Sequence, residues 1–119
     1  MYLRPFLIII FLILQSFLSV SKADTRNSNN EQILLAKHLS SIGAIFYGAE
    51  WCPYSQLQKE EFGKEALKYL NYVDCGSPQE GPKNCPSVAG IPVWVLNNET
   101  YESALTLDEL IQVSNYKKN

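Results

Sequence analysis

The chain has 119 residues, with 10 basic and 12 acidic side chains and a formal net charge of −2 at pH 7. A chain of this length forms one domain at most. Its mildly acidic balance leaves no basic surface of the kind that binds phosphates, so we expect no nucleic-acid partner.

The first 23 residues have the pattern of a secretory signal peptide. Arg4 supplies a short basic start, an apolar run extends from Phe6 to Leu14, and Ser21-Lys22-Ala23 is a small-x-small cleavage site. The alternative is an uncleaved N-terminal membrane anchor, although the run is shorter than the roughly 20 apolar residues of a membrane span. Either way we expect an extracytoplasmic protein (in a periplasm, in a thylakoid lumen or secreted), where disulfides persist.

The first helix of the folded domain is predicted to begin after a polar segment. Residues 24–30 are expected to form a loose linker. Ser28, followed three residues later by Glu31, is typical of a capping box, and the apolar spacing beyond it predicts a helix from about residue 31 to residue 41. His38 lies in this helix, where we expect a solvated or packed histidine and not a ligand.

A cysteine follows the first predicted strand. An apolar run at residues 44–47 leads into Trp51-Cys52-Pro53-Tyr54-Ser55, and a helix-like run from Gln56 to Phe62 comes next. The first N–H groups of a helix have no intrahelical partner, and the helix dipole adds partial positive charge there. Both favour a thiolate, so Cys52 is predicted to be a nucleophile near neutral pH. Pro53 suits the first helical position, where its missing N–H costs nothing.

The position that usually holds a second cysteine is occupied by Ser55. The common Cys-x-x-Cys motif shuttles a disulfide, whereas here the nucleophile is kept and the adjacent resolving thiol is replaced. In a helix that starts near Pro53, Ser55 faces the same way as Cys52. Its hydroxyl could therefore hydrogen-bond the sulfur and help to hold it ionised.

The helix after Cys52 is expected to be amphipathic. Leu57 and Phe62 are predicted to face inward, and the residues predicted to face outward are Gln58, Lys59, Glu60 and Glu61. Gly63 is expected to bend the helix before residues 65–70 resume it.

Three further strand-like runs follow, at residues 72–75, 91–96 and 99–103. A loop rich in Gly, Pro, Ser and Asn at residues 76–86 separates the first two. Asn97-Asn98 predicts a hairpin turn between the last two. Thr106 and Glu109 form a second capping box, which predicts a closing helix to about residue 114.

The predicted order of elements, with a nucleophilic cysteine after the first strand and a proline before the third, resembles the thioredoxin fold in its compact, glutaredoxin-like form. We therefore expect an α/β domain over residues 31–119, with a central mixed β-sheet flanked by helices. Several stretches are also similar to the thioredoxin-like domain fused to bacterial and plant vitamin K epoxide reductase homologues: Tyr47-Gly48-Ala49-Glu50-Trp51-Cys52-Pro53, Gln58-Lys59-Glu60-Glu61-Phe62-Gly63-Lys64-Glu65-Ala66, Tyr72-Val73-Asp74-Cys75 and Gly90-Ile91-Pro92-Val93-Trp94.

In that family the domain passes a disulfide between substrate proteins and a membrane-embedded, quinone-linked oxidase. The resemblance implies that Cys52 is the attacking cysteine and that Pro92 is held in cis beside it, an isomer that X-Pro bonds tolerate. The Ile91 backbone would then be presented to an extended substrate that pairs as an added strand. The alternative for Pro92 is an ordinary strand-edge proline.

The family also has cysteines that bracket the same loop, which suggests a disulfide between Cys75 and Cys85. The odd cysteine count agrees, because this pairing leaves Cys52 free. Closing so short a loop is expected to stabilise the domain by roughly 2–3 kcal/mol. The rival interpretation makes one of the two the resolving thiol for Cys52. The cysteine spacing matches no zinc signature, and we expect neither a metal nor a cofactor.

The side chains around Cys52 suggest how a substrate is received. Trp51 and Tyr54, with Pro53 and Ile91, are expected to form an apolar collar for cysteine-bearing peptides, while Trp94 is expected to lie mostly in the core.

The sequence thus predicts a protein thiol–disulfide oxidoreductase or isomerase of the monothiol type. Cys52 would form mixed disulfides with cysteine-containing protein substrates, and a second thiol from the substrate or from a small-thiol reductant would release them. A membrane quinone-linked disulfide oxidase is a further expected partner. The alternative, from a different functional class, is a redox-inactive module that retains the fold as a peptide-binding or partner-docking surface.

Overall fold

The computed structural model describes residues 21–79, 84–85 and 90–119. The expected signal peptide or anchor falls mostly on residues 1–20, outside the described residues. Among those described, no helix is both long enough and apolar enough to cross a membrane.

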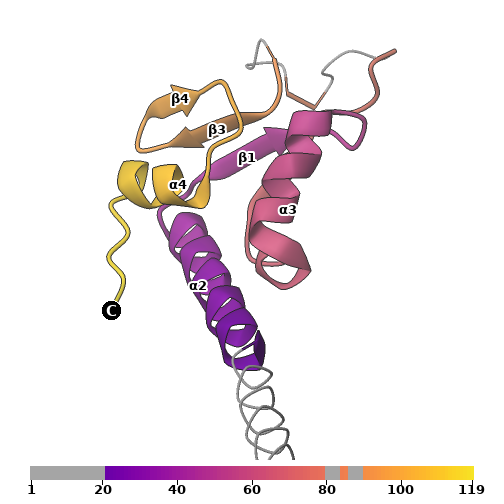
Figure 1. Ribbon diagram of the computed structural model, residues 1–119. Helices are drawn as coiled ribbons and strands as arrows, with labels where there is room; N and C mark the ends of the chain where they lie inside the picture. The colour runs from indigo at the N-terminus through magenta and orange to yellow at the C-terminus, as the bar shows by residue number, and fades with distance from the viewer. Residues whose placement is uncertain (1–20, 80–83, 86–89) are drawn as a thin grey trace, which may run out of the picture.

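Four strands of the described residues form one mixed sheet in the order β2-β1-β3-β4. Figure 1 labels β1, β3 and β4. Their bounds are β1 Ile45–Gly48, β2 Asn71–Asp74, β3 Val93–Leu96 and β4 Glu99–Tyr101. β1 runs parallel to β2 and antiparallel to β3, and β3 pairs antiparallel with β4. The predicted α/β class with a central mixed sheet is confirmed, and the arrangement is consistent with a thioredoxin-like fold.

Three helices contribute to a single core: α2 Ser21–Ser41, α3 Pro53–Leu67 and α4 Leu107–Val113. Phe46 of β1 lies opposite Trp94 of β3, and their rings stack with centroids 4.9 Å apart. Residues from all three helices complete the cluster, among them Leu35, Leu39, Phe62 and Leu110. This cluster fixes β1 and α3 against each other, and the connection between them carries Cys52.

The first helix begins earlier than the sequence predicts. α2 starts at Ser21 and includes residues 24–30, which were expected to form a loose linker, so Ser28 lies inside the helix and does not cap it. Residues 27–31 are exposed. An exposed helix satisfies its own backbone hydrogen bonds whatever the polarity of its side chains, and polarity alone was therefore a poor sign of a linker.

The predicted facing of α3 is wrong at Leu57 and Gln58, and Lys59, also predicted to face outward, has only 16% of its side chain exposed. Leu57, expected inside, is 53% exposed, and Gln58, expected outside, is 1% exposed. Gln58 is accommodated because both polar atoms of its amide have partners: its Oε1 accepts from Trp94 Nε1 at 2.9 Å and from the Leu105 N–H at 2.7 Å, and its Nε2 donates to the Leu105 carbonyl at 2.8 Å. Phe62 is buried as predicted, and Gly63 bends the helix with φ 75°.

The C-terminal elements agree with the sequence. Asn97 and Asn98 both have positive φ, 51° and 62°, which is the conformation that a two-residue hairpin turn needs. α4 begins after Thr106, whose Oγ1 accepts from the Glu109 N–H at 3.2 Å while Glu109 Oε2 accepts from the Thr106 N–H at 2.7 Å. The predicted capping box is confirmed.

Candidate active site

Cys52 lies between the end of β1 and the first turn of α3. Its backbone is extended, with φ −87° and ψ 118°, and Pro53 opens the helix directly after it. The residue occupies the cap position, yet its side chain forms no cap hydrogen bond. A neutral thiol is a weak acceptor, so the N–H groups of the first turn stay available until the sulfur loses its proton.

The environment of Cys52 favours the thiolate. Burial alone would raise the pKa of the Cys52 thiol. Hydrogen bonds that the Ser55 hydroxyl and the backbone N–H groups of Ser55 and Tyr54 donate to the thiolate outweigh burial, so the pKa is lowered overall. The residue is 5% exposed. A thiol with a lowered pKa is a better nucleophile near neutral pH than an ordinary cysteine.

Ser55 is completely buried beside the sulfur. Its Oγ accepts from the Ala49 N–H at 3.2 Å, which leaves the hydroxyl proton free to be donated toward Cys52. Gly48 permits this close approach, because a Cβ at that position would lie 3.0 Å from Ser55 Oγ. The buried Ser55 hydroxyl therefore lies beside the Cys52 sulfur and favours its ionised form.

The loop before β3 brings Ile91 and Pro92 to the sulfur. The Ile91–Pro92 peptide bond is cis. Cys52 Sγ donates to the Ile91 carbonyl oxygen at 3.9 Å. Pro92 is buried and Ile91 is half-buried, so the backbone at Ile91 forms one wall beside the thiol.

The residues expected to receive a substrate divide between surface and core. Trp51 and Tyr54 are 50% and 64% exposed beside Cys52, and Pro53 is also exposed. Trp94 is 1% exposed and belongs to the core. Trp51 Nε1 donates to the Gly76 carbonyl at 2.8 Å, and a shallow open hollow lies beside the indole, lined by Glu50, Trp51, Asp74, Gly76, Ser77, Pro78 and Asn84.

Cys75 and Cys85 form a disulfide, with their Cα atoms 5.3 Å apart, and Cys52 is the free cysteine. The Cys75 N–H donates to the Gly48 carbonyl at 2.8 Å. The bridged loop is thereby attached to the end of β1, a few residues from Cys52.

Sequence reasoning missed a brace that holds the connection before Cys52. Gln56 Nε2 donates to the Glu50 carbonyl at 2.8 Å, and Lys59 forms an ion pair with the Glu50 carboxylate. Hydrogen bonds from Lys59 and then Gln56 lower the pKa of that carboxyl.

Sequence reasoning also missed that Gln58 is buried. The buried residues of α3 are Ser55, Gln58, Phe62 and Ala66, which are spaced three or four positions apart. Extending this spacing from Ser55 along the helix would have predicted that Gln58 is buried.

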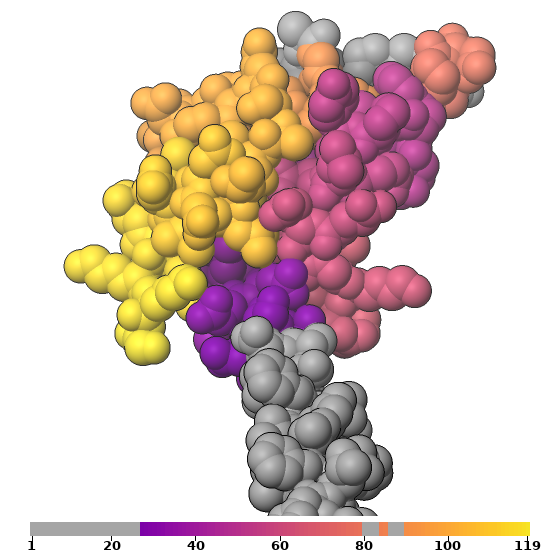
Figure 2. All heavy atoms as spheres, in the orientation of Figure 1, coloured from indigo at the N-terminus to yellow at the C-terminus, as the bar shows by residue number. Residues whose placement is uncertain are grey.

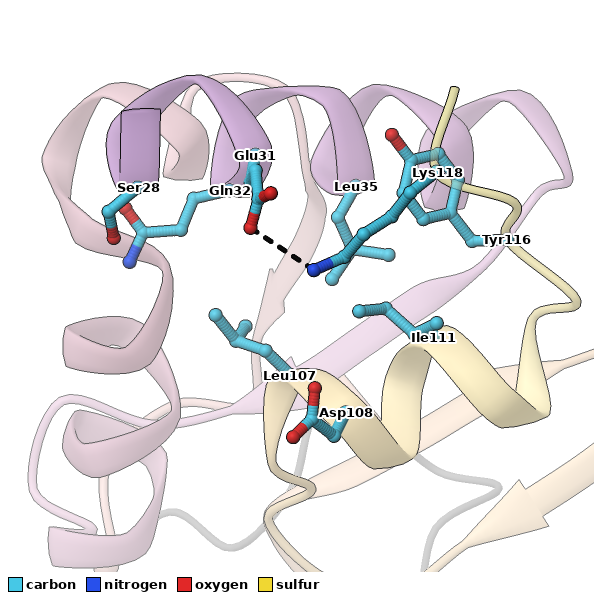
Figure 3. A pocket seen from close by; sticks show the side chains of 9 residues that line it. All are labelled: Ser28, Glu31, Gln32, Leu35, Leu107, Asp108, Ile111, Tyr116 and Lys118. Atoms are coloured by element: carbon cyan, nitrogen blue, oxygen red, sulfur yellow. Dashed lines mark hydrogen bonds and ion pairs between the residues drawn. The ribbon is translucent and has the colours of Figure 1, made fainter. Parts of the chain in front are cut away.

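Two other features do not join the site. His38 Nε2 lies 2.9 Å from the Ser114 carbonyl oxygen and its ring packs on Tyr116, and the described residues contain no group of three His, Cys, Asp or Glu that could hold a metal ion. A second hollow, of about 100 Å³, lies between α2 and α4, where an ion pair of 3.2 Å joins Lys118 to Glu31 (Figure 3). None of the predicted site residues lines it.

Comparison with known proteins finds a relative whose chemistry involves thiols, in agreement with the reactive cysteine of this site. No family model matches the chain. The chain is 41% identical over 97 residues to the thiol-disulfide oxidoreductase LTO1 of Arabidopsis thaliana, in an alignment that covers 76% of this chain and 26% of the plant protein. The chain thus spans about a quarter of the length of that relative. Over most of its own length, therefore, this chain is similar to one part of a thiol-disulfide oxidoreductase.

Proposed function

We propose that this protein carries out thiol–disulfide exchange through one thiol, that of Cys52. The observation that carries the proposal is the setting of its sulfur: a free cysteine at the start of α3, with a lowered pKa, beside the Ile91 carbonyl and the buried Ser55 hydroxyl. The similarity to a plant thiol-disulfide oxidoreductase supports the same class of reaction.

The reaction has two steps. The Cys52 thiolate attacks one sulfur of a substrate disulfide, so that a Cys52–substrate disulfide forms and the other substrate sulfur leaves as a thiolate. A second thiolate then attacks the mixed disulfide and returns Cys52 to the thiolate form. Because Ser55 cannot supply this second thiol and Cys75 is bonded to Cys85, it comes from the substrate or from a small thiol. This sequence suits isomerisation or trapping better than net oxidation.

The proposed substrates are cysteine-containing proteins outside the cytoplasm. The Cys75–Cys85 disulfide supports an oxidising compartment, and the N-terminal sequence pattern supports export. A small-thiol reductant or a membrane quinone-linked disulfide oxidase would complete the electron path, the latter by resemblance to the vitamin K epoxide reductase homologues.

Trapping of a mixed disulfide tests the proposal. The wild-type protein and Cys52→Ser are incubated with a disulfide-containing protein, quenched with acid and analysed without reductant by mass spectrometry. We expect a covalent adduct on Cys52 in wild type that disappears when a small thiol is added, and no adduct in Cys52→Ser.

Two results would contradict the proposal. A folded wild-type protein with a free Cys52 that forms no adduct would favour the redox-inactive binding module. A dominant peptide linking Cys52 to Cys75 or Cys85 would instead assign a resolving thiol and a dithiol mechanism.

A further inference from the structure

The outer face of α3 is more apolar than its buried face near Cys52. Ser55 and Gln58 point inward and are at most 1% exposed, whereas Tyr54 and Leu57 are 64% and 53% exposed. A helix that served only to fold the domain would show the opposite pattern. The buried polar groups have hydrogen-bond partners, so the fold accommodates them, whereas the apolar side chains of Tyr54 and Leu57 remain mostly exposed in the described part of the chain.

Several of the exposed apolar side chains lie within five residues of Cys52 in the sequence. The described part of the chain has five large hydrophobic side chains that are at least 43% exposed, and three of them form what we call the apolar ridge: Trp51, Tyr54 and Leu57. Positions three apart on a helix are neighbours on its surface, so Tyr54 and Leu57 lie side by side on α3, and Trp51 lies in the connection just before the helix. Figure 2 shows that the outward surface of α3 is open to solvent over much of its length.

The charge beyond the ridge distinguishes among possible occupants. Glu60 and Glu61 lie three and four positions after Leu57, both are exposed, and neither forms an ion pair within the described residues. One exposed lysine, Lys64, follows on the next turn, so the local charge is net negative and would be repelled by an anionic lipid surface. The two carboxylates would also oppose each other across a symmetric contact with a second copy of the chain. A protein segment with basic residues is complementary to them.

We propose that the apolar ridge, with Glu60 and Glu61, docks the substrate protein that exchanges with Cys52. It selects segments that have large apolar residues beside the reactive cysteine and basic residues about one helical turn further on. The inference rests on the proposed function, because a surface that docks a substrate protein beside Cys52 has this role only if Cys52 exchanges with that substrate.

Synthetic peptides test this selection. Each peptide carries one cysteine as a mixed disulfide with thionitrobenzoate. Attack by Cys52 joins its sulfur to the peptide sulfur and releases coloured thionitrobenzoate, whose absorbance gives the rate. One peptide has Leu and Phe beside the cysteine and two Lys four residues further on; a second has Ser in place of Leu and Phe; a third has Glu in place of Lys. Cysteine amide with the same leaving group is the reference.

We expect the apolar–basic peptide to react about five-fold faster than the Ser peptide, relative to cysteine amide, as the loss of contact with a large apolar side chain would predict. Leu57→Ser should bring that ratio close to one. Leu34→Ser is the matched control, because Leu34 is also 53% exposed but lies on α2, and it should keep the wild-type ratio. Exchanging Glu60 and Glu61 for lysine should reverse the preference between the Lys and Glu peptides at low salt, whereas Glu99→Lys should not.

The inference fails if wild type treats all three peptides alike, or if Leu57→Ser slows every substrate equally. It also fails if Leu57→Ser abolishes binding to phosphatidylglycerol vesicles or a dimer seen by sedimentation, since the ridge would then be a membrane or self-association surface. A wild-type protein that does not react even with cysteine amide would refute the proposed function itself.

Discussion

The first turns of α3 and α4 differ in how they use the same backbone groups. Both helices follow an extended cap residue, Cys52 before α3 and Thr106 before α4. Thr106 and Glu109 satisfy each other's backbone N–H groups in a closed capping box, whereas the Cys52 side chain forms no cap hydrogen bond. The first N–H groups of α4 are bonded within the capping box and stabilise the fold. Those of α3 can instead stabilise the negative charge on the Cys52 sulfur when it ionises.

The largest expected effect comes from giving the start of α3 a second thiol. Ser55→Cys would place a sulfur one turn from Cys52, at the ordinary spacing of a redox disulfide. We expect the variant to become a dithiol oxidoreductase that reduces insulin with an added electron donor, while wild type turns over slowly and accumulates mixed disulfides. A variant that forms the disulfide between Cys52 and the introduced thiol, yet remains as slow as wild type, would show that the surrounding site is not suited to redox exchange.

Removing the cap of α4 should affect stability alone. Thr106→Ala deletes the acceptor for the Glu109 N–H, and we expect the free energy of unfolding to fall by about 1 kcal/mol. Urea denaturation measures this change. The rate of Cys52 alkylation in the folded variant should equal that of wild type, and a slower rate would show that the two helix starts are coupled.

Replacing Cys52 by serine, a common helix-capping residue, should make the start of α3 resemble that of α4. In Cys52→Ser the hydroxyl can accept the N–H groups that a thiol leaves unpaired, so we expect a gain in the free energy of unfolding of up to about 1 kcal/mol at low pH. The folded pKa of Cys52 is lowered, so wild type gains stability as the pH rises through that pKa, and serine does not titrate. The difference in the free energy of unfolding between Cys52→Ser and wild type should therefore decrease as the pH rises.

Urea denaturation of both proteins at a series of pH values measures this difference. If the stability advantage of Cys52→Ser over wild type grew with pH, the folded protein would not stabilise the Cys52 thiolate, and the expected lowering of its pKa would be contradicted.

The smallest change is the loss of one hydroxyl. Ser55→Ala removes a hydrogen bond that lowers the pKa of Cys52, so the pH midpoint of Cys52 alkylation by iodoacetamide should move upward. Ser114→Ala is a matched control, because Ser114 is also a buried serine, 3% exposed, but belongs to the end of α4. An unchanged midpoint in Ser55→Ala would mean that the backbone N–H groups alone hold the thiolate.

The sequence predicted what neighbouring residues determine. Pro53 after Cys52 and the Thr106–Glu109 pair each specify a helix start within a few positions, and both helices start at the predicted places. The start of α2 could not be read in this way, because residues 27–31 are exposed and carry no apolar periodicity.

The parts of the site that depend on distant residues were harder to predict. The orientation of α3 is decided by Trp94 and Leu105, which are 36 and 47 positions from Gln58. The approach of Ile91 to the sulfur spans 39 positions and could be expected only from a resemblance to a known fold. Spacing within α3 can place Gln58 on the buried face, but it does not tell which distant residues meet its amide or that Ile91 approaches the sulfur.

Gln58 also has a consequence for the direction in which Cys52 points. Leu57 and Gln58 are about 100° apart around α3, and a rotation by that angle would bury the leucine in place of the amide. Apolar contact alone would favour the rotated state, but it would leave the Trp94 N–H buried without its acceptor. The Gln58 amide therefore holds α3 in one rotation about its axis. Because Cys52 directly precedes this helix, the same rotation places its sulfur beside the Ile91 carbonyl.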